Sequence, residues 1–585
     1  MNNETRTCQS CKTAFTIEPD DFAFYEKIQV PPPTWCPECR GKRRMIWWNE
    51  RNLFRKKEAL GGKEIFSTYP EGSDVVIYGH DDWWSDKWDA LSYGQDPDFS
   101  KPFLAQVQEL NRTVPWAAKS VQQMVNSDYC NQASRNKNCY LCFNGNDSEE
   151  CAYGVAFSGM RECYDFLNVN TCELSYEIFW ADKCYGCFYC LDIDSCRNVW
   201  FSKDMSNCQD CVGCAGLRNK QYCILNQQYS KEEYKKKFDE LNLGSHIANR
   251  SFFDEVRALW LTIPVKYMRG WNNVNVLGDY IESSKNARYC FEIVGGENIK
   301  YSQNVAFGVK DSHDYTNWGL QSELIYESVS VGENNRNIKF SFDCWPNCND
   351  LEYCLNCHSS SDLFGCVGLK KKQYCILNKQ YTKEEYFTLR EKIIAHMNDM
   401  PYTDKEGRTY RYGEFFPAEF SPLAYNETII ADYYPVAKEQ AVTEGFLWRD
   451  PNPREFQTTM VASDLPDHIR DATDDMVKQV IACASCRRAY RIIPSELKFY
   501  KRFSLPLPRL CHNCRYRERL AFRNPMKWQR RSCMCAGEAS ASGAYRNLAP
   551  HLHAAAACEN TFDTTYPPDS SYTVYCEPCY QAEMA

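Results

Sequence analysis

The middle of the chain carries one short stretch twice. Cys214 to Tyr234 reads CAGLRNKQYCILNQQYSKEEY, and Cys366 to Tyr386 reads CVGLKKKQYCILNKQYTKEEY, with 16 of 21 positions identical. Identity at this level does not arise by chance, so the middle of the chain is an internal duplication. Each copy opens near an Asp-Tyr pair, and we expect the copies to span 128–229 and 279–381.

A shorter spacing runs inside each copy. In the second copy, an aromatic residue followed by a small one recurs at about every twelfth position, or at small multiples of that interval. In the first copy, cysteines stand mostly twelve residues apart: Cys151, Cys163, Cys172, Cys184, Cys196 and Cys208. Short strands at an even spacing, separated by Gly, Asn, Asp and Ser, indicate a stacked β architecture. Taking two intervals per turn, we predict two β-solenoid or β-helix-like domains with coils of about 24 residues.

Each repeated stretch ends in a helix start signal. Ser230 with Glu233, and Thr382 with Glu385, form the pattern of a capping box, in which a hydroxyl caps the first turn and a glutamate reaches back. The preceding KQYCILN predicts the last strand of each solenoid. The helix that follows would cover a strand edge that otherwise invites pairing with another chain. The cysteine in this strand, Cys223 or Cys375, is therefore predicted to be a packing residue.

Cysteine is unusually abundant, with 34 in 585 residues. The N-terminal sequence MNNETRTCQSC has no apolar segment typical of an export signal, and no run approaches the roughly 18 apolar residues that span a membrane. We therefore expect a cytoplasmic chain with reduced thiols, in which CxxC pairs indicate metal sites before disulfides. Only nine histidines are present, and no base–nucleophile pattern is evident, so we do not expect an enzyme.

Two CxxC pairs with the same spacing lie near each end of the chain. They are Cys8, Cys11, Cys36 and Cys39 at one end, and Cys483, Cys486, Cys511 and Cys514 at the other. Two CxxC turns supply the four soft ligands of a tetrahedral zinc site. Strand-like apolar residues between the pairs, and a basic, helix-compatible segment after them, predict a zinc ribbon or treble clef. Metal binding would supply the folding energy of so small a module.

The N-terminal pattern resembles a zinc-ribbon domain family of treble-clef type. The matching features are the first CxxC, an aromatic at Phe15, Phe24-Tyr25, Pro33 and the sequence CPECRxxRR from Cys36 to Arg44. The resemblance implies four cysteine ligands for zinc and a structural role, with no firm function. The whole chain also resembles uncharacterised multi-zinc-ribbon proteins of bacteria, a likeness that implies no activity.

A second group of candidate ligands follows the C-terminal ribbon. Residues 560–580 resemble residues 65–84, with Cys576-x-x-Cys579 where the earlier segment has Gly79 and Asp82. The candidates are Cys533, Cys535, Cys558, Cys576 and Cys579, with His551 and His553 in reserve. Five cysteines exceed the four places around one zinc ion. We expect Cys576 and Cys579 with two of the others, which makes about three Zn²⁺ per chain.

The middle cysteines leave two interpretations open. Two CxxCxxC triplets stand two intervals apart: Cys184, Cys187 and Cys190, then Cys208, Cys211 and Cys214. They could form inward ladders, because free cysteine packs as a small apolar residue. They could instead bind zinc or, with less support, an iron–sulfur cluster, as in a metal-handling or redox protein. A carbohydrate-active β-helix is a second alternative, with candidates that fit turn positions better: Asp192, Asp194, Asp311 and Asp314.

The segments after the second CxxC pair of each ribbon are basic, although the formal net charge of the chain is −9. Phosphate attracts such a patch, and interleaved aromatics stack on bases. The candidate nucleic-acid contacts are Arg40, Lys42, Arg43, Arg44, Arg515, Arg517, Arg519 and Arg523. The alternative is that these cations are solvated, contact a protein, or bind an acidic surface of the same chain.

These observations predict a mainly β, multidomain chain with helices, in which zinc ribbons flank two duplicated solenoids with capping helices. We expect a ribbon at 1–60, a Trp-rich connector at 61–125, solenoids at 126–248 and 249–400, a Tyr/Pro-rich linker at 401–475, a second ribbon at 476–530 and a further metal module at 531–585. The predicted function is a non-enzymatic multi-zinc scaffold or adaptor. Its partner would be RNA, a ribonucleoprotein or a protein, and not a membrane.

Overall fold

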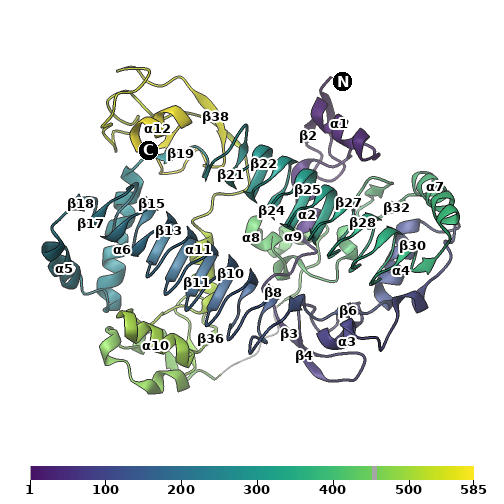
Figure 1. Ribbon diagram of the computed structural model, residues 1–585, viewed down its shortest axis with the longest axis horizontal. Helices are drawn as coiled ribbons and strands as arrows, with labels where there is room; N and C mark the ends of the chain where they lie inside the picture. The colour runs from purple at the N-terminus through teal and green to yellow at the C-terminus, as the bar shows by residue number, and fades with distance from the viewer. Residues whose placement is uncertain (1, 451–456, 585) are drawn as a thin grey trace. The chain divides into compact units, whose positions relative to one another are not determined.

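The computed structural model describes residues 2–450 and 457–584 and is mainly β with helices (Figure 1). The chain divides into two compact units, one built from residues 1–120 and 268–450, the other from 121–267 and 451–585. Each unit therefore joins one end of the chain to one copy of the duplication. The expected linker at 401–475 is divided between the units, and its residues 451–456 lie outside the described part. Within the described ranges, no helix combines the length and apolarity needed to cross a bilayer.

A 12-stranded sheet forms the core of the second unit; we call it the first ladder. Its strands are β7 (Val121–Gln122), β8 (Asn131–Ser134), β9 (Phe143–Asn146), β10 (Ala152–Ser158), β11 (Tyr164–Asn170), β12 (Tyr176–Asp182), β13 (Phe188–Asp194), β14 (Arg197–Trp200), β15 (Lys203–Ser206), β16 (Gln209–Val212), β17 (Gln221–Ile224) and β18 (Gln227–Gln228). Parallel pairing joins each residue to the twelfth residue after it, as Tyr164 to Tyr176. The predicted coil of two intervals is therefore wrong, because each interval is already a complete turn.

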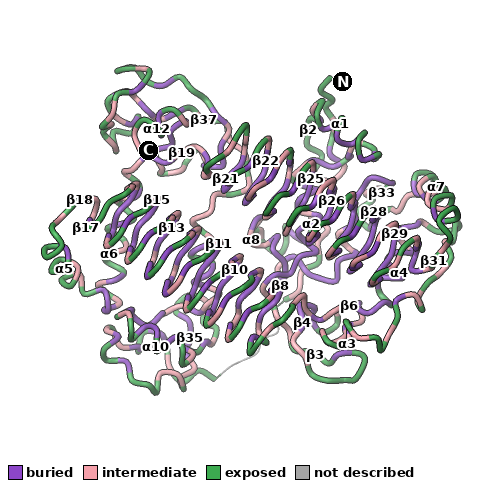
Figure 2. The backbone as a smooth tube through the Cα atoms, in the orientation of Figure 1, coloured by how far each residue is buried: buried purple, intermediate pink, exposed green. Residues whose placement is uncertain are grey.

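Within each turn of the first ladder, buried residues recur at every third position. One continuous core contains buried residues at every third position, among them Cys184, Cys187 and Cys190. The residue just before an inward position commonly has positive φ, as at Lys183 (50°) and Tyr189 (57°). This left-handed conformation turns the chain at each triplet, so that four triplets close one turn. The CxxCxxC triplets are consecutive inward positions of single turns. Figure 2 shows buried positions recurring along the strands of both sheets.

A second 12-stranded sheet forms the core of the first unit; we call it the second ladder. Its strands are β20 (Gly270–Trp271), β21 (Leu277–Glu282), β22 (Lys285–Val294), β23 (Glu297–Lys300), β24 (Gln303–Ala306), β25 (Lys310–Gly319), β26 (Glu323–Gly332), β27 (Arg336–Lys339), β28 (Asn349–Glu352), β29 (Ser361–Phe364), β30 (Gln373–Ile376) and β31 (Lys379–Gln380). Its turns vary in length: the first is one residue shorter than those of the first ladder, as the pair Gly270–Ile281 shows, and later ones are equal or one residue longer, as the pairs Asp279–Phe291 and Lys310–Glu323 show. Many of its inward positions hold serine or aliphatic residues where the first ladder has cysteine.

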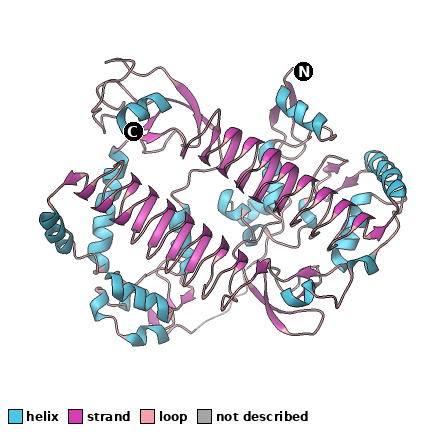
Figure 3. Ribbon diagram, in the orientation of Figure 1, coloured by secondary structure: helices cyan, strands magenta, loops and turns pink. Residues whose placement is uncertain are grey.

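Both ladders end as the repeated stretch predicts. The last parallel strands, β17 and β30, each fold back on a two-residue antiparallel strand, and helices α5 (Lys231–Glu240) and α7 (Lys383–Asp399) follow (Figure 3). The capping boxes at Ser230 and Thr382 are confirmed, since each hydroxyl accepts the N–H of the glutamate three residues on. Cys223 and Cys375 are 2% and 0% exposed, which confirms them as packing residues.

Each end of the chain forms a small cysteine module. In the N-terminal cysteine module, β1 (Glu4–Thr7) pairs with β2 (Ala14–Ile17), and helices α1 (Pro19–Lys27) and α2 (Pro37–Met45) follow. In the C-terminal one, β35 (Ile481–Ala482) pairs with β36 (Ala489–Tyr490), before α10 (Pro494–Phe503) and α11 (His512–Leu520). Between the CxxC pairs, the predicted strand is present only at Ala14–Ile17, and the next apolar residues belong to helix α1. Proline at the first position and a capping box explain the N-terminal start, since both favour a helix.

The remaining helices and strands lie outside the two ladders and the two cysteine modules. Helix α4 (Phe103–Thr113) has Pro102 as its N-cap. The other helices are α3 (His80–Trp84), α4 (Phe103–Thr113), α6 (His246–Thr262), α8 (Ile430–Tyr433), α9 (Lys438–Thr443) and α12 (Glu577–Met584), and the other strands are β3 (Phe54–Lys57), β4 (Glu64–Ser67), β5 (Ile77–Tyr78), β6 (Trp116–Ala117), β19 (Val265–Lys266), β32 (Tyr402–Thr403), β33 (Thr409–Tyr410), β34 (Met460–Val461), β37 (Gln529–Ser532), β38 (Thr561–Thr564) and β39 (Val574–Tyr575).

Candidate metal centres and the buried arginine clusters

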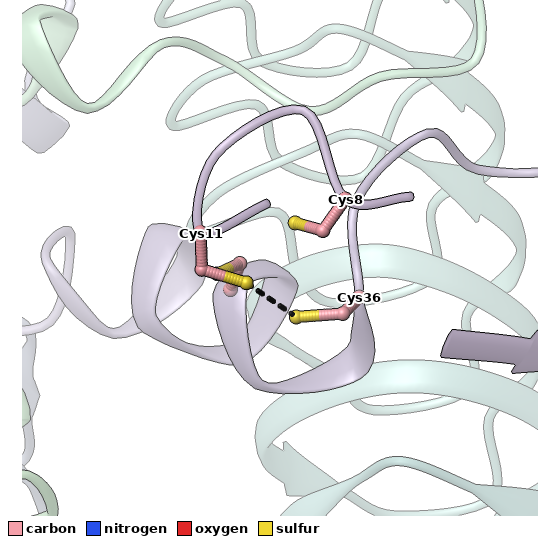
Figure 4. A group of neighbouring side chains, drawn as sticks. Cys8, Cys11 and Cys36 are labelled. Atoms are coloured by element: carbon pink, nitrogen blue, oxygen red, sulfur yellow. Dashed lines mark hydrogen bonds between the residues drawn. The ribbon is translucent and has the colours of Figure 1, made fainter. Parts of the chain in front are cut away.

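The four N-terminal cysteines converge as predicted. Cys8 and Cys11 lie on the turn between β1 and β2, while Cys36 is the N-cap of α2 and Cys39 lies in its first turn. The four sulfurs lie within 4.8 Å of one another, and Cys11 Sγ is 3.7 Å from Cys36 Sγ (Figure 4). A tetrahedron with Zn–S bonds of about 2.3 Å has edges of about 3.8 Å, so this contact matches one edge of a zinc site.

The C-terminal cysteines repeat this geometry. Cys483, Cys486, Cys511 and Cys514 lie within the same 4.8 Å limit, and Cys486 Sγ is 3.6 Å from Cys511 Sγ. Cys511 is the N-cap of α11, and its N–H donates to Cys483 Sγ at 3.3 Å. A backbone donor of this kind stabilises a thiolate, the form that binds metal. Both groups are therefore suited to a divalent metal ion.

A third all-cysteine group lies in the final module, residues 526–584. Cys533, Cys558, Cys576 and Cys579 are all buried, and Cys558 Sγ is 3.8 Å from Cys576 Sγ. The two cysteines that join Cys576 and Cys579 are thus Cys533 and Cys558. Cys535 belongs to a different group, with His551, His553 and again Cys579. The reserve histidines are therefore part of a ligand cluster that shares one cysteine with the first.

The turn after β3 matches the turn that carries Cys533 in the final module, but a residue other than cysteine holds it. β3 pairs with β4 as β37 pairs with β38, and Glu58 stands where the final module has Cys533. The Glu58 side chain accepts N–H groups from Leu60 at 2.9 Å and Gly61 at 2.6 Å. A carboxylate thus holds the turn that a metal ion would hold in the final module. This explains how the N-terminal copy keeps its shape without these ligands.

Five of the eight predicted nucleic-acid contacts are buried, each no more than 4% exposed: Arg40, Arg43, Arg44, Arg515 and Arg519. Their prediction as phosphate contacts is wrong, because carboxylates within the same unit already engage them. Lys42 is largely covered and pairs with Glu38 at 3.0 Å. Arg517 is exposed, and Arg523 is half-buried. The alternative that these cations bind an acidic surface of the same chain is the correct one for the buried five.

In the first unit, helix α2 delivers three arginines to the second ladder. Arg40 Nη2 and Arg44 Nη1 each lie 2.9 Å from opposite oxygens of Asp314, on β25. Arg43 Nη2 lies 3.2 Å from Glu327, on β26, and a further carboxylate, Glu414, completes its pairing at 3.0 Å. Three cations thus meet three carboxylates in a buried cluster, which avoids the cost of an unpaired buried charge.

In the second unit, helix α11 delivers two arginines to the first ladder. Arg515 Nη2 lies 2.8 Å from Asp165 and 3.2 Å from Glu496, while Arg519 lies 3.1 Å from Asp165 and 2.5 Å from Glu177. Burial raises the pKa of Glu177 to about 7 against the opposing effect of Arg519, and burial also raises the pKa of Glu496. One proton on either of these two glutamates would bring three carboxyl groups into balance with two arginines.

The two clusters are built alike. Asp165 and Glu177 lie one turn apart on the first ladder, and Asp314 and Glu327 lie one turn apart on the second. All four have positive φ, the left-handed position of each triplet. Other contacts recur at equivalent positions of the two cysteine modules. Arg40 donates to the carbonyl of Trp35 and stacks over Tyr301, and in the same way Arg515 donates to Leu510 and stacks over Tyr153.

The middle thiols behave as packing groups. Cys163 Sγ, for example, donates to the carbonyl of Arg161 at 3.2 Å and of Cys172, in the next turn, at 3.4 Å. Among the residues that the structure describes, no group of three or more closely spaced metal-type ligand atoms includes a cysteine of either ladder. Two of the aspartates considered for carbohydrate chemistry are also engaged, because Asp314 holds two arginines and Asp311 pairs with Lys27 at 2.8 Å. These contacts favour the inward-ladder interpretation.

Sequence reasoning missed the carboxylates that receive the arginines. A signal was present, since the separation of Asp165 from Glu177, and of Asp314 from Glu327, equals one turn of the respective ladder. The acidic residues of α1, Glu18, Asp20 and Asp21, gather within 4.8 Å of one another, but Lys300 bridges all three at 2.8 to 3.0 Å. That ammonium group already pairs with all three carboxylates.

Comparisons with known proteins do not place the chain in a family. No protein-family description matches the sequence, and no curated protein matches it. Among solved structures, a chain assigned by inference as an acetyltransferase from Desulfovibrio desulfuricans G20 has 8% identity and a TM-score of 0.10, over 50% of this chain and 86% of that one. A similarity this weak carries no argument about fold or activity. The resemblance to zinc-ribbon proteins stays a prediction.

Proposed function

We propose that this protein is a non-enzymatic, multi-zinc scaffold in which zinc ribbons clamp two β-solenoids. The observation that carries the proposal is the position of α2 and α11. Each helix begins at a CxxC pair that belongs to a four-cysteine group, and each places its arginines on ladder carboxylates within its own unit. A metal ion that fixes the start of the helix would thereby also fix the arginines on the ladder.

Zinc is the ion that this ligand chemistry favours. Four thiolates at tetrahedral spacing select zinc or iron–sulfur chemistry, and a closed set of four leaves no position for substrate. Structural zinc would supply folding energy that a module of about 45 residues cannot obtain from its own core. We propose one zinc ion in each of the three all-cysteine groups.

An anionic partner such as RNA would have to bind exposed arginines that are not buried against ladder carboxylates. Arg487, Arg488 and Arg491 are exposed and lie on and beside the β35–β36 hairpin. Arg517, which was predicted as a contact, is exposed on α11. These residues replace the buried arginines as the candidate surface, and phosphate contacts of this kind would weaken steeply with added salt.

Metal analysis tests the scaffold. The full chain, purified anaerobically without added metal, should contain zinc in at least threefold molar ratio, and Cys8→Ser combined with Cys36→Ser should remove one equivalent. Hydrogen exchange in α2 should then rise, because its arginine contacts loosen. Zinc below one equivalent, or iron in similar amounts, overturns the proposal and favours the metal-handling alternative.

RNA binding needs its own test. Titration of a single-stranded RNA at low salt should show binding that falls when Arg487, Arg488 and Arg491 are changed to Gln. A charge-matched control changes three exposed lysines of α5 to Gln, at Lys235, Lys236 and Lys237. Equal effects of the two triple variants, or no binding at low salt, refute the RNA claim and leave the scaffold intact.

A further inference from the structure

We propose that the final module holds two metal ions that share the thiolate of Cys579. This inference rests on the proposed zinc site of the third all-cysteine group and adds a second ion beside it. The second ligand set is Cys535, His551, His553 and Cys579, whose ligand atoms also lie within 4.8 Å of one another. Cys579 is the member common to both sets.

The ligand count fits two tetrahedra that share a corner. Two separate tetrahedral ions need eight ligands, and one shared corner reduces the requirement to seven. The module supplies seven side chains of the right chemistry, namely Cys533, Cys535, Cys558, Cys576, Cys579, His551 and His553. With one ion alone, Cys535 and both histidines would have no metal role. The surplus of cysteines over four places is thereby explained.

The distances within the second set match coordination geometry. Cys535 Sγ lies 3.4 Å from His551 Nδ1, and His553 Nε2 lies 3.2 Å from Cys579 Sγ. With Zn–S near 2.3 Å and Zn–N near 2.0 Å, a tetrahedral S–N edge is about 3.5 Å. Both contacts are close to that value. The ring nitrogens thus approach the sulfurs as neighbouring ligands of one ion would.

In both histidines, the ring nitrogen that does not face a cysteine has its own oxygen partner, as in metal-binding histidines. The other nitrogen of His551, Nε2, faces Glu583 Oε2 at 3.3 Å, and the two side chains are 1% and 0% exposed. The other nitrogen of His553, Nδ1, lies 2.7 Å from the carbonyl of Ala556. Metal-binding histidines characteristically donate their second N–H to a carboxylate or carbonyl, which fixes the ring and directs the free nitrogen to the metal.

An amide donor supports the cysteine that is unique to the second set. Asn547 Nδ2 lies 3.3 Å from Cys535 Sγ, and the side-chain oxygen Oδ1 of Asn547 accepts from the hydroxyl of Tyr575 at 2.9 Å, which fixes the direction of the amide. In the first set, Asn560 Nδ2 donates to Cys576 Sγ at 3.4 Å. Each set therefore has its own side-chain donor to a sulfur, as expected for two thiolate-bound ions.

Charge also favours two divalent ions. The two histidines bind as neutral ligands, so the thiolates set the charge of the centre. One Zn²⁺ bound by the four thiolates of the first set, with Cys535 as a neutral thiol, leaves a net charge of −2, whereas two ions bound by all five thiolates leave −1, within reach of the amide and backbone donors. Two ions would also hold residues 536–559, which form turns and isolated bridges rather than helices or strands, against α12. The centre would thus replace the core that this segment lacks.

Stoichiometry of the full chain tests the second ion. The wild type should contain four zinc ions, and a variant with His551→Ala and His553→Ala should contain three, with the first set intact. His396→Ala, a histidine outside every ligand group, serves as control and should keep four. A wild-type value of three that the histidine variant does not change overturns the second ion and leaves the proposed scaffold standing. A value near zero overturns the scaffold itself.

Cobalt substitution tests the bridge. High-spin Co²⁺ ions joined by one thiolate couple magnetically, so the paramagnetic resonance signal of the four-cobalt chain should integrate to less than its cobalt content. In the His551→Ala, His553→Ala variant, the signal per cobalt should recover fully. An uncoupled signal from a chain that holds four cobalt ions would refute the shared Cys579.

Discussion

Replacing Asp165 with Asn should destabilise the second unit by about 3 kcal/mol at pH 7. Asp165 is fully buried and holds both Arg515, at 2.8 Å, and Arg519, at 3.1 Å. Removing one partner of a buried ion pair costs about 3–5 kcal/mol, because the other charge stays buried without compensation. We expect the lower end of this range, since Glu177 can compensate in part.

The compensation by Glu177 makes the effect depend on pH. Burial raises the pKa of Glu177 to about 7, Arg519 opposes the rise and Asp165 adds to it. Without Asp165 the pKa of Glu177 should fall, so that Glu177 is ionised at pH 7 and partly neutralises the two arginines. As the pH falls through the lowered pKa, Glu177 takes up its proton and the compensation is lost. The cost of Asp165→Asn should therefore grow between pH 7 and pH 5.

Hydrogen exchange of the α11 amides, measured by mass spectrometry on the full chain, reports this cost. Asp147→Asn is a matched control. Asp147 has the same left-handed backbone (φ 54°, against 56° for Asp165) and also faces an arginine one turn away, Arg135, but that pair is exposed. Exposed pairs contribute about 0–1 kcal/mol. If Asp165→Asn costs no more than Asp147→Asn, or if its cost does not depend on pH, the buried cluster does not hold the helix and the reasoning fails.

Three further predictions concern other parts of the molecule. A strong zinc chelator at neutral pH should raise hydrogen exchange in α2 and α11 at least tenfold before it does so in β11 and β12, measured over a time course on the full chain. The first unit should lose stability as the pH falls from about 6.5 toward 3, because burial lowers the pKa of His313 and of His358 to about 3. Both histidines are neutral in the folded unit throughout this range, whereas the unfolded chain takes up protons below pH 6.5. Urea titrations should show a smaller loss of stability in the His313→Gln variant. Gly154→Ala should destabilise the first ladder by about 1–3 kcal/mol, because a Cβ there would lie 2.1 Å from the Phe166 ring, and Phe166→Leu should recover part of the loss in the same urea titration.

Local signals in the sequence predicted the elements that depend on local chemistry. The capping boxes, the last strand of each ladder and the four-cysteine groups each depend on a few residues with fixed spacing, and all are present. The turn length was predicted wrongly, because a regular interval between strands can be half a turn or a whole one. The triplet spacing of Cys184, Cys187 and Cys190 held the missing information, since inward positions at every third residue imply four short sides within a single interval.

The partners of the arginines could not be predicted in the same way. Arg44 and Asp314 are 270 residues apart, and nothing near either residue identifies the other. Only the parallel register places Asp314 beside Glu327, and that register depends on the turn length that the sequence left ambiguous. In the final module, by contrast, the sequence alone identifies His551 and His553 as possible ligands, and the proposed second ion would account for the surplus of cysteines over four places.

The recurrence of the buried arginine cluster in both units changes how the basic segments are interpreted. A run of arginines after a CxxC pair is commonly taken to indicate nucleic-acid binding. Here Arg40 and Arg515 occupy the same place after their cysteines, and both are engaged by carboxylates on adjacent turns of a ladder. Because these arginines are buried, their guanidinium groups cannot reach the phosphates of an RNA. Under the proposed function, their use within each unit would link metal binding to ladder stability, because the same short helix carries a cysteine pair at one end and the buried arginines along its length.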